Sequence, residues 1–358
     1  MTNLEEFHLP SGISPKPIDL QPFFTAAWAG FGRNIRILSL GGNIDGFQVL
    51  PASQPVLTAL EELHLEFTDT MNLPIPNTSA AVVAADRRRT LLNNCVAPFI
   101  NGLGSRLRVL KICSWSSIDM STFFKHIGPF PILHTFSVWA VFNISFASDP
   151  SGLTQALYGV SPNLKDLTLR LHSSTHFSEV QFGDVLYQWL KGTLHNNNQF
   201  GRHLTHLQLN PPPIETGLDN LIVFIQRSAA TLMHLYVRDR YLHYPEIKSI
   251  STAFSPYTSL QSLRLNVRKL PLELLDLLAK SFPNLKNLTL RAADGQPPID
   301  FGEQLQSHRY DDWGLWDIGI WQAGNQLEHE LMLVIAQCIP SVGSFWGQGN
   351  MEDLVQRR

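Results

Sequence analysis

Histidines and cysteines are the residues of this 358-residue chain that could bind a metal or carry out nucleophilic catalysis. The chain has 13 histidines and three cysteines, but none of them falls into a metal-ligand spacing. His329-Glu330 lacks the second histidine of a zinc-protease motif, and His203 and His206 are three residues apart across the start of an expected strand. The cysteines are scattered and are expected to be reduced thiols: Cys95, Cys113 and Cys338. Phosphate-binding glycine motifs and a GxSxG nucleophile motif are also missing from the sequence, so we expect no metal, no cofactor and no enzyme.

Arginine and tyrosine offer a second kind of chemistry, the recognition of acidic groups on a partner. Four arginines lie inside or directly after a short aliphatic phrase that recurs along the chain: Arg170, Arg238, Arg264 and Arg291. Where their side chains point therefore depends on the structure that this phrase forms.

The phrase consists of an aliphatic residue, two variable residues, an apolar one, a variable one and an apolar one. Ten copies are visible: LEEFHL from Leu4, IRILSL from Ile35, LEELHL from Leu60, LRVLKI from Leu107, LHTFSV from Leu133, LKDLTL from Leu164, LTHLQL from Leu204, LMHLYV from Leu232, LQSLRL from Leu260 and LKNLTL from Leu285. A weaker eleventh copy is VGSFWG from Val342. The interval between copies ranges from 25 residues, between Ile35 and Leu60, to 47 residues, between Leu60 and Leu107. Ten copies at uneven intervals indicate an irregular leucine-rich repeat.

Each phrase predicts a strand, because its apolar residues alternate with variable ones. The segments between phrases show apolar spacing typical of helices, for example over 179–194, 216–232 and 271–282. Proline stands two residues before four of the phrases and is expected to end the helix there: Pro131, Pro162, Pro283 and Pro340. Similar strands joined by long helical crossovers must run parallel.

These elements predict an α/β leucine-rich-repeat solenoid, a horseshoe with a parallel sheet on the concave face and helices on the convex face. We expect repeats over 1–291, and over 292–358 a tryptophan-rich excursion, a helix and a degenerate last repeat that caps the C-terminal end. The long segment before Leu107 is expected to hold a loop, LPIPNTS, and then a helix through DRRRTLLNNCVAPFI.

The third, fifth and seventh positions of each phrase should form the concave face. Acidic residues gather there in the first copies, and arginines gather in the later ones. Arg238, Arg264 and Arg291 come from consecutive copies and are expected to form a ladder beside Tyr236. The predicted partner-binding residues are Arg170, His234, Tyr236, Arg238, Arg264, Asn266 and Arg291. The alternative is that this face is a solvated polar surface.

A second group of candidate residues is Trp313, Trp316 and Trp321. The first interpretation is that these tryptophans cover the open end of the array as a cap. The alternative is an exposed aromatic binding patch interleaved with Asp311, Asp312 and Asp317.

The ragged period and the PNL-before-strand phrasing (Pro162-Asn163-Leu164 and Pro283-Asn284-Leu285) resemble fungal F-box/leucine-rich-repeat proteins. That resemblance implies the substrate-recognition part of a ubiquitin-ligase receptor. The first phrase begins at Leu4, so an adaptor is expected as a partner only if an F-box lies upstream. The F-box-like phrase LPLELLDLLAK from Leu270 falls between two repeats, where its apolar residues are needed for a repeat helix.

The function expected from the sequence is therefore a protein–protein interaction scaffold whose partner carries an acidic or phosphorylated segment. The alternative is a repeat protein that regulates an enzyme, such as a GTPase activator. That activity needs an exposed arginine on a repeat loop near a nucleotide, and Arg240 is the nearest candidate. An enzyme built on a parallel β-helix is a third possibility, and the helical crossovers argue against it. The net charge of −3 favours neither nucleic acid nor a membrane as a partner, and we expect a cytoplasmic or nuclear protein without a secretory signal.

Overall fold

The computed structural model describes residues 4–9, 21–53, 56–68, 79–114, 118–173, 178–293, 301–322, 325–326 and 329–346. Of the segments expected from the sequence, most of the LPIPNTS loop lies outside the described residues. The chain forms two compact units, unit 1 over Met1–Phe200 and unit 2 over Gly201–Arg358.

Unit 1 contains parallel strands that pair in the order of the chain. They are β1 (Glu6–Leu9), β2 (Ile37–Asn43), β3 (Glu62–Thr68), β4 (Val109–Ser114), β5 (Thr135–Phe142) and β6 (Asp166–Ser173). The α-helices between and after them are α1 (Gln21–Phe31), α2 (Ser79–Leu91), α3 (Ala97–Leu103), α4 (Ser121–Lys125), α5 (Ile144–Ser148), α6 (Ser151–Val160) and α7 (Glu179–Asn196). Short 3₁₀ segments are η1 (Gly32–Asn34), η2 (Ile44–Ser53) and η4 (Ser161–Asn163).

The helix expected through DRRRTLLNNCVAPFI is divided. A turn of π-helix, η3 (Leu92–Val96), separates α2 from α3. Leu92 and Val96 of η3 and Phe99, Ile100 and Leu103 of α3 are buried, whereas most described side chains of α2 are exposed. Only the second half of that segment therefore contributes to the core.

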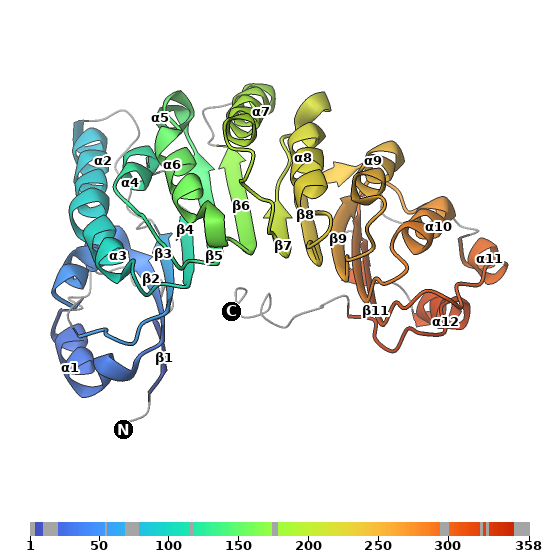
Figure 1. The fold of residues 1–358 in the computed structure, drawn as a ribbon, viewed down its shortest axis with the longest axis horizontal. Coiled ribbons are helices and arrows are strands. Elements are labelled where there is room, and N and C mark those ends of the chain that lie inside the picture. Colours follow the sequence, from blue (N-terminus) through green and yellow to red (C-terminus); the bar gives the residue numbers. More distant parts are fainter. Residues whose placement is uncertain are drawn as a thin grey trace. The chain divides into compact units, whose positions relative to one another are not determined.

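Unit 2 repeats the arrangement. Its strands β7 (His206–Leu209), β8 (His234–Leu242), β9 (Ser262–Val267), β10 (Asn287–Ala292) and β11 (Asp317–Gln322) pair in parallel, and the short β12 (Asn325–Gln326) pairs antiparallel with β11. The helical elements are η5 (Glu215–Leu218), α8 (Asp219–Ser228), α9 (Tyr244–Phe254), α10 (Leu272–Ser281), α11 (Phe301–Gln306) and α12 (His329–Cys338). In both units the helices lie along one face of the strands (Figure 1). The predicted α/β leucine-rich-repeat fold is thus confirmed.

The register shows how each phrase becomes a strand. In every parallel pair whose partners are described, the third position of one copy lies beside the third position of the next, for example Glu6 beside Ile37 and Asn287 beside Ser262. From the second copy to the tenth, the apolar residues at the first, fourth and sixth positions face the helices and are buried, as for Leu260, Leu263 and Leu265. This burial of one strand face per copy supplies the core of each unit.

Within each unit, a carbonyl at the second position of one copy joins it to the next copy. Glu5 O accepts hydrogen bonds from the N–H groups of Arg36 (2.7 Å) and Ile37 (3.1 Å), and Lys286 O accepts from Trp316 (2.9 Å) and Asp317 (2.9 Å) in the same way. The bond from Lys286 identifies LWDIGI, from Leu315, as a repeat copy, because Leu315, Ile318 and Ile320 match the template and are buried. This segment was expected to belong to the tryptophan-rich excursion.

The weak copy from Val342 continues the same pattern after LWDIGI. Trp316 O accepts from Gly343 N (2.9 Å) and Ser344 N (3.1 Å), and Ser344 forms a parallel bridge with Asp317. VGSFWG is therefore a degenerate copy, as predicted. It follows the copy LWDIGI, which was not predicted from the sequence.

Hydroxyl groups before the leading aliphatic residue add a second link between copies in unit 2. Ser259 Oγ donates to Ala229 O (2.7 Å) and Leu232 O (3.0 Å). Ser341 Oγ likewise contacts Trp313 O (2.6 Å) and Leu315 O (2.7 Å). Each of these hydroxyls thus contacts two carbonyl oxygens around the start of the preceding copy.

Candidate protein-binding face

The strand face opposite the helices carries the side chains that could bind a partner; we call it the helix-free face (Figure 1). In β9, Leu263 and Leu265 are buried toward the helices, whereas Arg264 and Asn266, which alternate with them in sequence, are half-buried on the opposite side. The third, fifth and seventh positions therefore lie on the helix-free face, as the alternation predicts.

In unit 1 this face holds Arg170, which was predicted to bind a partner. Its guanidinium carbon lies 3.8 Å from the ring centroid of Trp139 on the neighbouring strand, and the Trp139 ring is also 5.5 Å from that of His172. A cation over an indole face is attracted by the ring quadrupole. Arg170 therefore belongs to an aromatic–cation cluster and lies in a different unit from the other predicted residues.

His64 on β3 is the titratable group of unit 1 with the clearest expected effect. Burial lowers its pKa to about 3, helped by the charges of Lys111 and His8. The Glu62 carboxylate, 3.9 Å from His64 Nε2, would favour the protonated form but does not outweigh burial.

Acidification is therefore expected to destabilise the fold through His64. The unfolded chain takes up this proton near the ordinary pKa of about 6.5, whereas the folded chain takes it up only near pH 3. The contribution of neutral His64 to the free energy of unfolding is complete above pH 6.5. It is lost as the pH falls toward 3, and the loss is about 2 kcal/mol at pH 5. Urea unfolding at pH 7 and pH 5 should show this extra loss in the wild type and not in His64→Gln. An equal loss in both proteins would contradict the assignment.

In unit 2 the helix-free face begins with stacked aromatic rings. His206 on β7 and His234 on β8 are paired in the strand register, and their ring centroids are 4.7 Å apart with planes inclined by 16°. Tyr236 approaches the His206 ring edge-on, with the centroids 5.0 Å apart. The predicted residues His234 and Tyr236 therefore form one aromatic surface with His206.

The arginines of unit 2 do not form the predicted ladder. Arg264 lies beside Tyr236 and Thr289, at the fifth position, whereas Arg291 lies beside Asn266 and Trp321, at the seventh. Arg238 should share the row of Arg291, but the register shifts between Val237 and Tyr241. Three residues bulge out of the strand at this point, so Tyr241 takes the place expected for Arg238.

The seventh-position row of unit 2 therefore reads Tyr241, Asn266, Arg291 and Trp321 across β8 to β11. We call these four residues the Tyr–Asn–Arg–Trp row. Asn266, Arg291 and Trp321 are half-buried and Tyr241 is 43% exposed. Tyr241 was missed from the sequence, because the seventh position counted along the phrase from Leu232 is Arg238.

Arg240, in the bulge, is a structural residue. Its Nη1 donates to Pro212 O (2.5 Å) and Ile214 O (2.8 Å), and its Nη2 pairs with the Glu246 carboxylate. A Cβ on the neighbouring Gly217 would overlap the Pro212 carbonyl, so the loop closes tightly on the guanidinium. The sequence-based view of Arg240 as an exposed arginine available to a nucleotide is wrong.

The three candidate tryptophans lie in three environments. Trp313 is buried and its Nε1 donates to Phe282 O (3.0 Å). Trp316 is 61% exposed, and its ring covers Gly343, where a Cβ would lie 2.6 Å from Trp316 Cη2. Trp321 lies on the helix-free face beside Arg291. They therefore form neither one cap nor one patch, and only Trp321 joins the predicted binding residues.

Ser307, His308 and Asp276 have the composition of a catalytic triad. Ser307 Oγ is 3.1 Å from His308 Nδ1, and His308 Nε2 is 3.9 Å from Asp276 Oδ2. Nδ1 and the serine hydroxyl, however, also approach Gln304 O, at 3.0 and 2.7 Å. A carbonyl can only accept, so Nδ1 carries a proton and cannot serve as the base for Ser307. The group closes the C-terminal end of α11.

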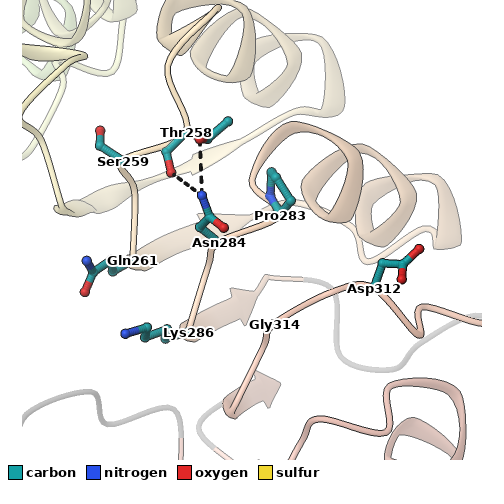
Figure 2. Close-up of a pocket in the computed structure, with 8 residues that line it drawn as sticks. All are labelled: Thr258, Ser259, Gln261, Pro283, Asn284, Lys286, Asp312 and Gly314. Atoms are coloured by element: carbon teal, nitrogen blue, oxygen red, sulfur yellow. Dashed lines mark hydrogen bonds between the residues drawn. The ribbon is translucent and has the colours of Figure 1, made fainter.

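A shallow pocket of about 490 Å³ opens in unit 2 beside the loops that precede β9, β10 and β11. Figure 2 shows the Asn284 amide bonded to Thr258, with Lys286 and Gln261 at one end and Asp312 at the other. Most of its lining residues are polar, and most are exposed. Opposite charges at its two ends favour neither sign of ligand.

Within the described ranges, no group of three or more His, Cys, Asp or Glu side chains is placed to hold a metal ion. Among the helices that the structure describes, none has the length and apolar character needed to cross a bilayer.

Comparison with known proteins leaves the family open. No protein-family model matches the chain, and no curated protein matches it. Among solved structures, the chain is similar to one described as the crystal structure of the Rad7 and Elc1 complex in yeast. The identity is 16%, the match covers 92% of this chain and 79% of that chain, and the TM-score is 0.41. The leucine-rich-repeat assignment rests on the chain's own strand register and carbonyl bonds.

Proposed function

We propose that this chain is a protein–protein interaction scaffold whose helix-free face in unit 2 binds an acidic or phosphorylated segment of a partner protein. The observation that carries the proposal is the register, which brings Arg264 and Arg291 onto one surface with Tyr236, Tyr241 and Trp321. Arginine, tyrosine and tryptophan are the residues most often found at interface hot spots. A guanidinium also bonds a carboxylate or phosphate with two parallel N–H groups.

The charge of this face supports the sign of the proposed partner. Asp317, an acidic residue of the same strands, is 5% exposed and its carboxylate accepts from Trp346 N (3.0 Å). Asp239 is exposed but lies in the bulge, outside the rows formed by the paired residues. Arginine charge therefore dominates the paired rows, and an anionic segment fits them.

A finer proposal is that the scaffold serves as the substrate-recognition part of an F-box-type ubiquitin-ligase receptor. It is supported by the ragged period and by the PNL phrases alone. Copurification of the natural full-length protein with a cullin adaptor tests it separately from binding through unit 2. The alternative, a regulator of an enzyme, needs an exposed arginine on a repeat loop. Arg240 was the candidate for that role, but its guanidinium is bonded to Pro212, Ile214 and Glu246. The proposal assigns no catalytic step to the chain.

Reversing two charges on the face is expected to abolish partner capture. Arg264→Glu combined with Arg291→Glu replaces the attraction for an acidic segment with repulsion. The matched control, Arg33→Glu with Arg89→Glu, makes the same change in net charge on exposed helical residues of unit 1. Affinity capture with mass spectrometry should identify proteins that the wild type and the control retain and that the double variant loses.

Direct binding of each purified partner to the three proteins, at two salt concentrations, then completes the test. Partners that bind the double variant as tightly as the wild type would contradict the proposal. A fall in melting temperature for the double variant alone would show instead that the arginines stabilise the fold.

A further inference from the structure

The Tyr–Asn–Arg–Trp row places two hydrogen-bond donors, Asn266 and Arg291, between two aromatic side chains. Asn266 and Arg291 are direct neighbours on β9 and β10, Tyr241 flanks them on β8, and Trp321 flanks them on β11. Neighbouring strands are about 4.8 Å apart, so Tyr241 and Trp321 stand about 14 Å apart across the sheet.

The bulge of β8 sets this arrangement. Without it, Arg238 would lie beside Asn266 and the row would hold a second cation in place of an aromatic ring. Asp239 adopts φ of 61° within the bulge, a left-handed conformation that aspartate tolerates better than most residues. Arg240 points back and fixes the bulge to the loop at Pro212 and Ile214. Bulges that re-aim a side chain in this way are common beside functional sites.

The chemistry of the row combines charge with ring contacts. The Asn266 amide and the Arg291 guanidinium can both donate to a carboxylate or phosphate oxygen. At the β8 end, the guanidinium carbon of the exposed Arg268 lies 6.0 Å from the Tyr241 ring centroid, which adds positive charge. The two flanking rings offer apolar surface on either side of the anion.

The spacing of the row defines a sequence pattern in its ligand. An extended peptide advances about 3.3 Å per residue, and alternate side chains point to the same side. A span of about 14 Å is therefore close to four residues of peptide. Side chains two positions before and two positions after a central acidic residue would reach Tyr241 and Trp321.

We propose that the Tyr–Asn–Arg–Trp row binds an extended segment in which an acidic residue is flanked, two positions away on each side, by aromatic or large apolar residues. The segment runs across the strands, from β8 to β11. This inference rests on the proposed function, since it names the ligand class of the same face. It goes beyond charge by assigning Tyr241 and Trp321 as the residues that determine specificity.

Fluorescence polarisation with three labelled synthetic peptides tests the inference. The first peptide has a central glutamate, tryptophans at the −2 and +2 positions, and serine and glycine elsewhere. The second carries glutamine in place of the glutamate, and the third carries serine in place of both tryptophans. The wild type should bind the first peptide about tenfold more tightly than either of the others, a preference of about 1.4 kcal/mol.

Two variants and a matched control locate the effect on the row. Tyr241→Ser and Trp321→Ser should each reduce the advantage of the tryptophan peptide over the serine peptide at least threefold, while the preference for glutamate over glutamine remains. Tyr257→Ser removes a tyrosine of similar exposure (48%) outside the row and should change neither preference. Circular dichroism of each variant confirms that it is folded.

The outcomes separate this inference from the proposed function. Glutamate preference without tryptophan preference would overturn the inference and leave the acidic-segment proposal standing. Tryptophan preference without glutamate preference, or no binding of any peptide at about 1 mM, would overturn the inference, and partner capture by the Arg264→Glu/Arg291→Glu variant would then decide the proposed function. Tighter binding of a labelled decauridylate than of any peptide would also overturn it, because stacked rings and arginines can bind single-stranded RNA.

Discussion

Replacing Arg240 by alanine is expected to lower the free energy of unfolding by about 3–5 kcal/mol. The guanidinium side chain is only 12% exposed, donates to the Pro212 and Ile214 carbonyls and pairs with Glu246. Its removal leaves these two carbonyls without their donor and leaves the largely buried Glu246 carboxylate without its cation. Breaking a buried pair on one side costs far more than the pair contributes, because the remaining charge stays out of water.

Urea unfolding followed by circular dichroism measures the Arg240→Ala effect directly. Arg268→Ala is the matched control, since Arg268 follows the next strand and is exposed; it should change the unfolding free energy by less than about 0.5 kcal/mol. The double variant Arg240→Ala/Glu246→Ala should be less destabilised than the sum of the two single variants, because the second substitution removes the unpaired charge. A loss below about 1 kcal/mol for Arg240→Ala would show that the contact behaves as a surface ion pair.

The strands and their order were predictable because the repeat phrase encodes burial directly. The fourth and sixth positions are apolar in all ten predicted copies, and from the second copy onward both are buried. The helices of the later repeats follow for a similar reason: α10 lies at Leu272–Ser281, inside the segment 271–282 where its apolar periodicity predicts it. The F-box-like phrase from Leu270 is this repeat helix, with Leu274, Leu275 and Leu278 buried.

The copy from Leu315 was missed although it obeys the same template. Two of its variable positions hold Trp316 and Gly319 in place of the polar residues common in other copies. The cluster of tryptophans suggested an irregular excursion, whereas burial depends only on Leu315, Ile318 and Ile320. Counting apolar positions alone, without regard to the intervening residues, would have found this strand.

The candidate site could be predicted only in part, because counting along the chain assumes an uninterrupted strand. Asn266 and Arg291 were assigned correctly to the helix-free face, since β9 and β10 are regular. Tyr241 could not be assigned, because the bulge of β8 depends on bonds from Arg240 to Pro212 and Ile214, residues 28 and 26 positions earlier in the chain. A phrase of six residues carries no information about such long-range contacts.

Replacing Leu288 by alanine should lower the free energy of unfolding by about 2–5 kcal/mol. Leu288 is fully buried on β10, between Leu263 on β9 and Ile318 on β11, so the truncated side chain leaves a cavity that its neighbours can fill only partly. Leu333→Ala makes the same chemical change at a leucine of α12 that is 52% exposed, and its effect should stay below about 0.5 kcal/mol in urea unfolding.

Ile318→Ala extends this comparison to the copy that the repeat template overlooked. Ile318 is buried beside Leu288 in the parallel register of β10 and β11, so its truncation should also cost about 2–5 kcal/mol. If the segment from Leu315 were an excursion lying on the surface, Ile318→Ala would instead resemble Leu333→Ala. A measured loss near that of Leu288→Ala requires that the hydrophobic core of unit 2 continue through β11. The Trp321 side of the Tyr–Asn–Arg–Trp row would then be held by a packed strand, as a preorganised binding surface requires.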